Sequence, residues 1–131
     1  MICSNRDTAL LILAHGSPRP ESNSGLYAMA KACEERSDYA LVQVGFLECN
    51  DPSIPVAIDQ CAQPGVKRII TVPYFLHTGT HVSEDLPNLL EEGRNRHSDV
   101  EFLLADFIGR STKVTEILGD RIESAREKAR S

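Results

Sequence analysis

The chain has 131 residues, of which 41% are hydrophobic and 25% charged, and its formal net charge is −5. This length fits one domain with its own core, and the acidic balance argues against a nucleic-acid or anionic-membrane partner. No stretch approaches the ~18 apolar residues of a membrane span, and residues 1–8 lack the apolar segment of a signal peptide. We therefore expect one domain over residues 1–131, working in the cytoplasm.

Short apolar runs and amphipathic segments alternate along the whole chain. Strands are predicted at 9–14, 39–47, 67–74 and 101–105. Helices are predicted at about 22–36, 51–63, 84–96 and 111–129. The third helix is expected to start at Ser83-Glu84-Asp85, with Pro87 in its first turn. The alternation favours an open parallel α/β sheet of about four strands with helices on both faces.

The four cysteines form neither a C-x-x-C pair nor a zinc-finger spacing. Reduced thiols, as in a cytosolic protein, are therefore expected. A four-stranded sheet also leaves its edges poorly covered, so pairing with a second copy of the chain is expected on physical grounds.

Ionisable side chains follow each predicted strand. His15 follows the first strand, Glu48 the second, His77 and His81 the third, and Asp106 the fourth. Parallel strands place their carboxyl ends at one edge of the sheet, where ligands of such proteins bind. Imidazoles exchange a proton or hold a borderline metal near neutral pH. This edge is therefore the candidate site, whereas the fourth histidine, His97, is expected at a solvated helix end.

Several residues beside these groups have a structural as well as a functional interpretation. Ser17 can stabilise a tight turn or contact a ligand, and Asn23 can cap the following helix or hold the loop. Gly79 lets the backbone approach a ligand closely beside His81. His77 is either a second imidazole of the site or a bystander that lines it.

Several common catalytic motifs do not occur in the sequence. There is no Walker A loop, no G-x-G-x-x-G, no H-E-x-x-H and no serine elbow. Nucleotide hydrolysis, dinucleotide binding, zinc protease and esterase functions therefore lose support.

Three segments together resemble a known family. His15-Gly16-Ser17 with Asn23, then Phe46-Leu47-Glu48 with Pro52-Ser53-Ile54, and then the stretch 73–87 occur in this order. They are similar to the H-G-S-x5-N, F-x-E…P-S-I and P-x-F-L-x-x-G-x-H-x-x-x-D-I-P motifs of the class II tetrapyrrole chelatases, the CbiX/SirB-type sirohydrochlorin chelatases. The resemblance spans about residues 10–87.

The resemblance implies insertion of a divalent metal into sirohydrochlorin, on a cobalamin- or sirohaem-type route. The metal, Co²⁺ first and Ni²⁺ or Fe²⁺ next, is a substrate, and no nucleotide is needed. His15 and His81 are implied as metal ligands and, with Glu48, as the catalytic residues. Contacts to the tetrapyrrole are expected from the neighbouring residues Ser17, Asn23, His77, Gly79 and Thr80. A chain with one such unit is expected to act as a homodimer.

Neutral imidazole suits this reaction, because it holds a metal moderately and accepts a pyrrole proton. A non-catalytic metal or tetrapyrrole carrier on the same fold is the alternative. A phosphoryl-transfer enzyme with His15 as nucleophile is less favoured, because Ala14 stands where such enzymes usually have arginine.

Overall fold

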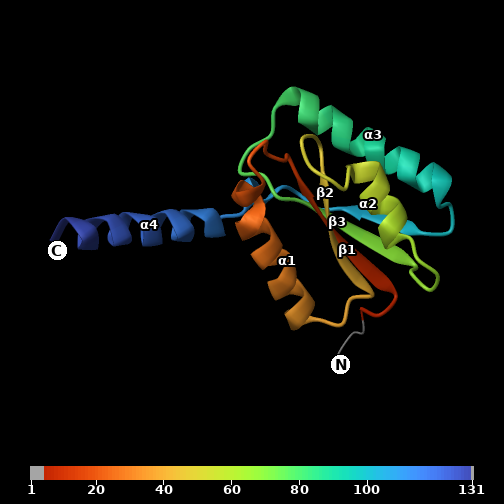
Figure 1. Ribbon diagram of the computed structural model, residues 1–131, viewed down its shortest axis with the longest axis horizontal. Coiled ribbons are helices and arrows are strands. Elements are labelled where there is room, and N and C mark those ends of the chain that lie inside the picture. Colours follow the sequence, from red (N-terminus) through yellow and green to blue (C-terminus); the bar gives the residue numbers. More distant parts are fainter. Residues whose placement is uncertain (1–4, 131) are drawn as a thin grey trace.

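The computed structural model describes residues 5–130, except for the side chain of His81. Its four strands are β1 (Thr8–Ala14), β2 (Leu41–Phe46), β3 (Arg68–Pro73) and β4 (Glu101–Leu104). They pair in parallel in the order β2-β1-β3-β4, which confirms the predicted open parallel sheet (Figure 1). The helices are α1 (Ser24–Arg36), α2 (Ile54–Cys61), α3 (Thr80–Arg96) and α4 (Lys113–Arg130), and the 3-10 turns η1 (Pro20–Asn23) and η2 (Ile108–Arg110) precede α1 and α4.

The core forms on both faces of β1, the central strand, whose seven residues are all buried. Ala9, Leu11 and Leu13 face α2 and α3, whereas Leu10 and Ile12 face α1. A strand covered on both faces needs a continuous apolar sequence rather than an alternating one. This is why the run 9–14 was recognisable from the sequence.

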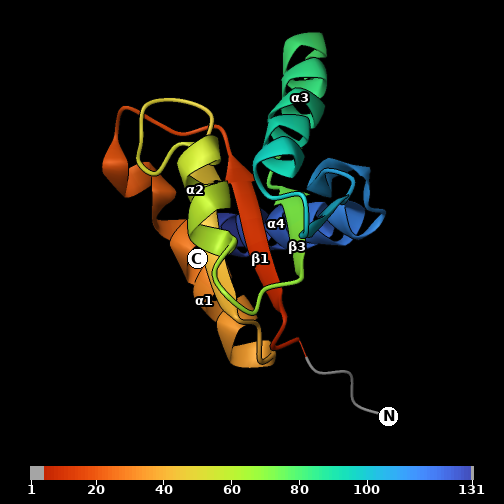
Figure 2. The same ribbon diagram turned by 90° about the vertical axis from the view of Figure 1, so that its right-hand side faces the viewer.

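The helices divide unequally between the two faces. β1 connects to β2 in one direction along the sheet, whereas β2 to β3 and β3 to β4 run in the other. Right-handed crossovers therefore place α1 on one face and both α2 and α3 on the opposite face, as Figure 1 shows; Figure 2 gives the view turned by 90°.

The last helix covers neither face. α4 leaves the body and has no buried residue. The expectation that every helix covers the sheet is therefore wrong for α4. None of the helices within residues 5–130 is both long and apolar enough to span a bilayer.

Helix α3 begins one turn earlier than predicted. Gly79 is its extended N-cap residue, and the Ser83 backbone N–H and hydroxyl both donate to the Gly79 carbonyl, each at 3.1 Å. Ser83 therefore closes the first turn instead of capping a later one. Pro87 lies in the interior of the helix and not in its first turn. Because proline has no backbone N–H, it removes one hydrogen-bond donor from the helix interior.

The capping of the first two helices differs. Asn23 is the N-cap residue of α1 but its side chain makes no cap bond, so of the alternatives open for this side chain, capping is contradicted. Ser53 does cap α2, because its hydroxyl accepts from the Val56 N–H at 3.4 Å.

The C-terminal end of α3 is tied to α2 through one carboxylate. Asp59 of α2 accepts from the His97 ring at 2.8 Å and from Arg96 at 3.1 Å. The bond from His97, together with the nearby Arg96 guanidinium, lowers the pKa of Asp59 below its usual value. His97 is thus at the helix end, as predicted, but partly buried and paired rather than solvated.

This carboxylate predicts an acid-dependent loss of stability. A carboxyl group with a lowered folded-state pKa stabilises the fold above its unfolded-state pKa of about 3.9, and the contribution disappears as the pH falls through the lower folded-state value. Asp59→Asn is expected to lower the free energy of unfolding by up to about 1 kcal/mol near pH 6, with little difference near pH 2. Urea unfolding at several pH values measures this, and an equal loss at pH 2 and 6 would contradict it.

The described cysteines differ in accessibility. Cys61 is fully buried under the sheet, and burial raises the pKa of its thiol to about 12. Cys49 is exposed. Since the thiolate is the reactive form, iodoacetamide at pH 8 is expected to label Cys49 in the native protein and Cys61 after unfolding. Peptide mass mapping measures both, and native labelling of Cys61 at the rate of Cys49 would contradict the prediction.

Candidate active site

A histidine and a carboxylate meet at the carboxyl edge of the sheet. His15 follows β1, Glu48 follows β2, and His15 Nε2 lies 2.6 Å from Glu48 Oε1. The two side chains are 56% and 61% exposed, so a ligand can reach the pair from solvent. Two predicted catalytic residues, which are 33 positions apart in the sequence, are thereby in direct contact.

The backbone around this pair is closely fitted. Gly16 has a φ of +99°, and any Cβ there would overlap the backbone carbonyl of Glu48. The Glu48 N–H donates to the His15 carbonyl at 3.1 Å, and the Ser17 N–H donates to the Asn50 side chain at 2.7 Å. These contacts tie the loop that carries His15 to the loop that carries Glu48.

The Phe75 ring and a close backbone contact at Gly109 also shape this edge of the sheet. The Phe75 ring meets the His15 ring edge-on, with centroids 6.4 Å apart. The Gly109 N–H donates to the Phe75 carbonyl at 2.9 Å, and a Cβ at Gly109 would overlap the Leu76 carbonyl. The loop after β4 thus fixes the segment after β3, and that segment positions Phe75 beside the imidazole.

The segment with the other two histidines is more open. His77 and Gly79 are exposed, and Thr80 is the exposed first residue of α3. Thr78 and Ser83 bond through their hydroxyls at 3.1 Å across the start of the helix. His81 lies in the first turn of α3, and its side chain is outside the described part of the structure. The predicted pairing of His15 with His81 therefore stays a prediction.

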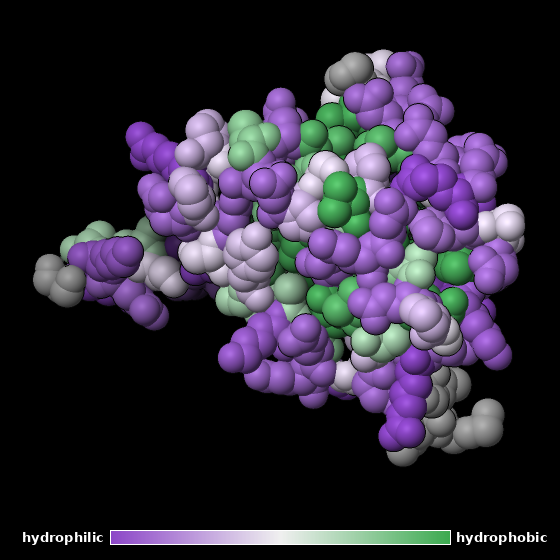
Figure 3. All heavy atoms as spheres, turned by 45° about the vertical axis from the view of Figure 1, so that its right-hand side comes forward, coloured by the Kyte–Doolittle hydropathy of each residue, from purple (hydrophilic) through white to green (hydrophobic). Residues whose placement is uncertain are grey.

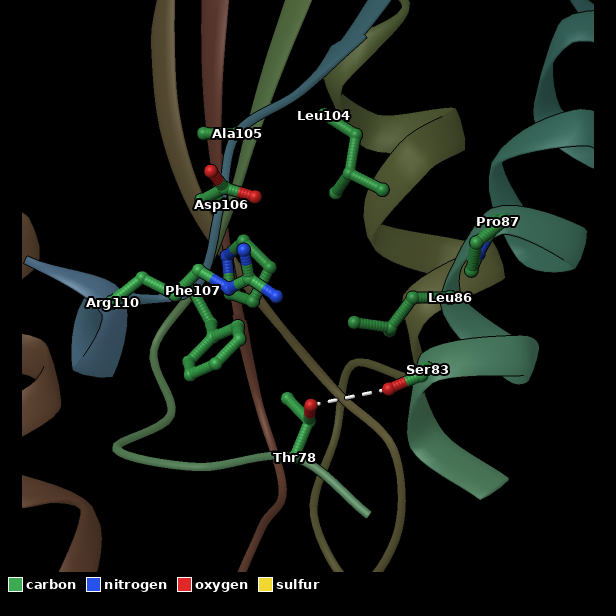
Figure 4. A pocket seen from close by; sticks show the side chains of 10 residues that line it. Thr78, Ser83, Leu86, Pro87, Leu104, Ala105, Asp106, Phe107 and Arg110 are labelled. Atoms are coloured by element: carbon green, nitrogen blue, oxygen red, sulfur yellow. Dashed lines mark hydrogen bonds between the residues drawn. The ribbon is translucent and has the colours of Figure 1, made fainter. Parts of the chain in front are cut away.

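A hollow of about 210 Å³ lies between the start of α3 and the end of β4 (Figure 4). Thr78, Ser83 and Leu86 line one side, while Asp106 and Arg110 line the other. The Arg110 guanidinium lies 5.6 Å from the centre of the Phe107 ring. The hollow thus combines apolar walls with hydroxyl groups, a carboxylate and a cation.

Two residues of this edge were not anticipated from the sequence. Asn50 orients the His15 loop, and Arg110 adds a cation opposite α3. Asn50 stands beside a turn, where asparagine is common for many reasons. Nothing in the sequence distinguishes Arg110 from other loop arginines; only the fold brings it to the same hollow as Ser83. Among the other predicted residues, Ser17 lies in the His15 loop, whereas Asn23 is buried at the end of η1.

The close contact with Glu48 distinguishes the two ring nitrogens of His15, because Nε2 faces the carboxylate. In the tautomer that carries its proton on Nε2, toward the carboxylate, the neutral imidazole has its lone pair on Nδ1. Nδ1 can then bind a metal or accept a proton, and Glu48 stabilises the imidazolium that forms. Within the described side chains, no three His, Cys, Asp or Glu residues gather as a closed metal site.

The fold and site define an open parallel α/β protein with an exposed histidine–carboxylate pair at its carboxyl edge. The family model described as CbiX matches residues 9–125. The chain therefore belongs to the CbiX family, and the resemblance seen in its motifs is confirmed.

Named relatives fall into two length classes. The chain is 31% identical over 121 residues to a sirohydrochlorin cobaltochelatase of Priestia megaterium, with 92% of this chain and 39% of the relative covered. It is 32% identical to a chloroplastic sirohydrochlorin ferrochelatase of Arabidopsis thaliana, covering 87% of this chain and 51% of the relative. A sirohydrochlorin cobaltochelatase of Methanocaldococcus jannaschii is 32% identical to the chain, and the match covers 96% of that relative. The chain thus spans about two fifths of the first relative, about half of the second and nearly all of the third.

Solved structures share the fold. A CbiX protein from Marinobacter aquaeolei matches with a TM-score of 0.80 at 24% identity, covering 92% of this chain and 98% of the other. The chelatase SirB of Bacillus subtilis subspecies spizizenii, solved in complex with cobalt, matches with a TM-score of 0.80 at 23% identity. This chain covers 50% of SirB.

Proposed function

We propose that this protein is a sirohydrochlorin metallochelatase that inserts Co²⁺, or alternatively Ni²⁺ or Fe²⁺, into the tetrapyrrole. The single observation that carries this proposal is the His15–Glu48 pair, 2.6 Å apart and open to solvent, within the matched family region. The names of the relatives support sirohydrochlorin as the substrate and cobalt or iron as the metal.

In this proposal His15 and His81 hold the incoming metal. As the metal passes to the macrocycle, the freed His15 Nδ1 accepts one of the two displaced pyrrole protons and the freed His81 imidazole accepts the other, and both protons then pass to water. Glu48 holds the His15 ring and stabilises its charged form. Moderate binding by two imidazoles lets the metal pass on to the macrocycle, which a closed four-ligand site would hinder. Ser17, Asn23, His77, Gly79 and Thr80 remain the proposed tetrapyrrole contacts.

Arg110 joins this proposed set. Sirohydrochlorin carries carboxylates around its rim, and a guanidinium binds carboxylates well. Arg110 lines the hollow beside α3, so it is placed to hold one of them.

Residues 1–131 act in this proposal as one unit, paired with a second copy. A cytoplasmic location fits the free thiols of Cys33, Cys49 and Cys61, since such thiols are usual in a reducing compartment.

Metal competition tests the proposal. Purified protein is mixed with sirohydrochlorin and each metal in turn, and insertion is followed by absorbance. The same mixture without protein is the uncatalysed control. Many turnovers per protein with at least one metal are expected. Metal or tetrapyrrole binding that stops at one equivalent, with no increase in insertion rate, would overturn the enzyme proposal and indicate a carrier.

A further inference from the structure

The loop after β2 contacts the His15 segment with two side chains. Glu48 contacts the His15 ring, and Asn50, two residues further on, accepts at Oδ1 from the Ser17 N–H at 2.7 Å. Asn50 is half-buried, whereas Glu48 is exposed. The two side chains therefore hold the segment 15–17 at both of its ends, and the proposed mechanism uses only one of them.

The backbone between these two side chains has a rare conformation. Cys49 has a φ of +69°, which is uncommon for a residue other than glycine. The Asn50 N–H donates to the Glu48 carbonyl at 2.8 Å, and this bond over three residues, with that φ, matches the classic γ-turn. A turn this tight keeps Glu48 and Asn50 close together, so both side chains can reach one short segment. Backbone of this kind costs free energy and occurs mainly at functional sites.

The segment between the two contacts fits closely against the turn. A Cβ at Gly16 would overlap the Glu48 carbonyl oxygen and lie 3.1 Å from Asn50 Oδ1. The Glu48 N–H also donates to the His15 carbonyl at 3.1 Å. The backbone is thus held before, at and after Gly16 by the same three-residue turn. The backbone position from which the His15 imidazole extends depends on all three contacts.

The chemistry of the contact fixes which way the Asn50 amide faces. The Ser17 N–H is a donor, so the group that meets it has to be an oxygen, and Nδ2 faces elsewhere. Aspartate at position 50 can present the same oxygen, whereas alanine and leucine cannot. Without that acceptor the Ser17 N–H, which is partly buried, has to find another partner, and the segment has to move.

We infer that Asn50 is a positioning residue for metal insertion. Through the Ser17 N–H it holds the segment 15–17 against the γ-turn, and this keeps the His15 imidazole in contact with the Glu48 carboxylate. In this role Asn50 touches neither the metal nor the tetrapyrrole. Its kinetic effect rests on the proposed function, so the test includes a structural measurement that needs no activity.

The first test is kinetic. Asn50→Ala is expected to lower kcat for cobalt insertion by about 10- to 100-fold, the usual effect of removing a group that orients a metal-binding imidazole. Asn50→Asp is expected to keep most of the rate, because it retains the acceptor oxygen. Asn50→Leu, which keeps the volume but not the oxygen, is the second disruptive variant. Asn95→Ala, at an exposed position in the last turn of α3, is the matched control and is expected to keep the wild-type rate.

A double-mutant cycle separates positioning of His15 from a direct contact with the tetrapyrrole. In a His15→Ala background, Asn50→Ala is expected to lower the rate little further, because the imidazole that Asn50 positions is already absent. Asn50→Ala that lowers the rate by the same factor in both backgrounds would overturn the inference. So would Asn50→Asp that loses as much rate as Asn50→Ala.

Proton NMR tests the positioning without reference to turnover. The His15 and Phe75 rings meet edge-on with centroids 6.4 Å apart, so a nuclear Overhauser effect between their ring protons reports where the imidazole lies. This signal is expected to weaken in Asn50→Ala and Asn50→Leu and to persist in Asn50→Asp and Asn95→Ala, with circular dichroism confirming each fold. An undisturbed signal in both disruptive variants would overturn the inference. A wild type without turnover whose ring contact still depends on Asn50 would overturn the proposed function and support the positioning of His15.

Discussion

Replacing His15 by alanine is expected to reduce metal insertion by about 10²-fold or more, the usual effect of removing a positioned proton acceptor. The imidazole follows β1 at the exposed edge of the sheet and is 56% exposed, so its removal leaves no cavity in the core. The midpoint of thermal unfolding is therefore expected to change little. Initial rates of cobalt insertion, followed by absorbance, measure the effect.

His97→Ala is the matched control, since that imidazole pairs with Asp59 at the opposite end of α3. It is expected to keep its insertion rate, although it loses some stability. The insertion rate of Glu48→Gln is expected to lie between those of the His15→Ala and His97→Ala variants, because an amide still contacts His15 but cannot stabilise an imidazolium. An H15A variant with half the wild-type rate would contradict the catalytic assignment.

The second large effect is expected from Gly16→Ala. A methyl group there overlaps the Glu48 carbonyl, and the φ of +99° disfavours any side chain. Either the His15 loop or the Glu48 loop has to move, which is expected to cost about 2 kcal/mol or more of unfolding free energy. For a chain of this size that lowers the melting midpoint by roughly 5–10 °C. Insertion is also expected to slow, because the histidine–carboxylate contact is lost.

Gly25→Ala provides the contrast, because a Cβ at that helical position meets nothing within 4 Å. It is expected to raise stability by up to about 1 kcal/mol. Urea unfolding of both variants is the measurement. Equal stabilities for the two glycine variants would show that the tight fit between the loops is not needed.

The strands were predictable because burial on both faces requires a recognisable apolar sequence. β1 lies between two helical layers, and only a continuous apolar run fits that place. The start of α3 was predicted one turn too late, because Ser83-Glu84-Asp85 can either cap a helix that begins there or complete the first turn of a helix that begins earlier. The hydrogen bonds to the Gly79 carbonyl decide between them, and no local pattern encodes those bonds.

The part of the site that follows from the order of the parallel strands could be predicted from the sequence. Parallel strands bring their carboxyl ends together, so His15 and Glu48 could be expected on one edge before their contact was known. Asn50 and Arg110 could not be expected, since their roles depend on how separate loops pack. Helix α4 was also predicted from the sequence, but its distance from the sheet was not. That distance is set by the turn around Gly109.

The outward course of α4, which Figure 3 shows as a projecting arm, has a consequence for local stability. None of its residues is buried, so little packing from the rest of the chain supports it. An element of this kind opens at a much lower free energy than the core does. The backbone amides of α4 are therefore expected to exchange with solvent much faster than those of β1, whose seven residues are all buried.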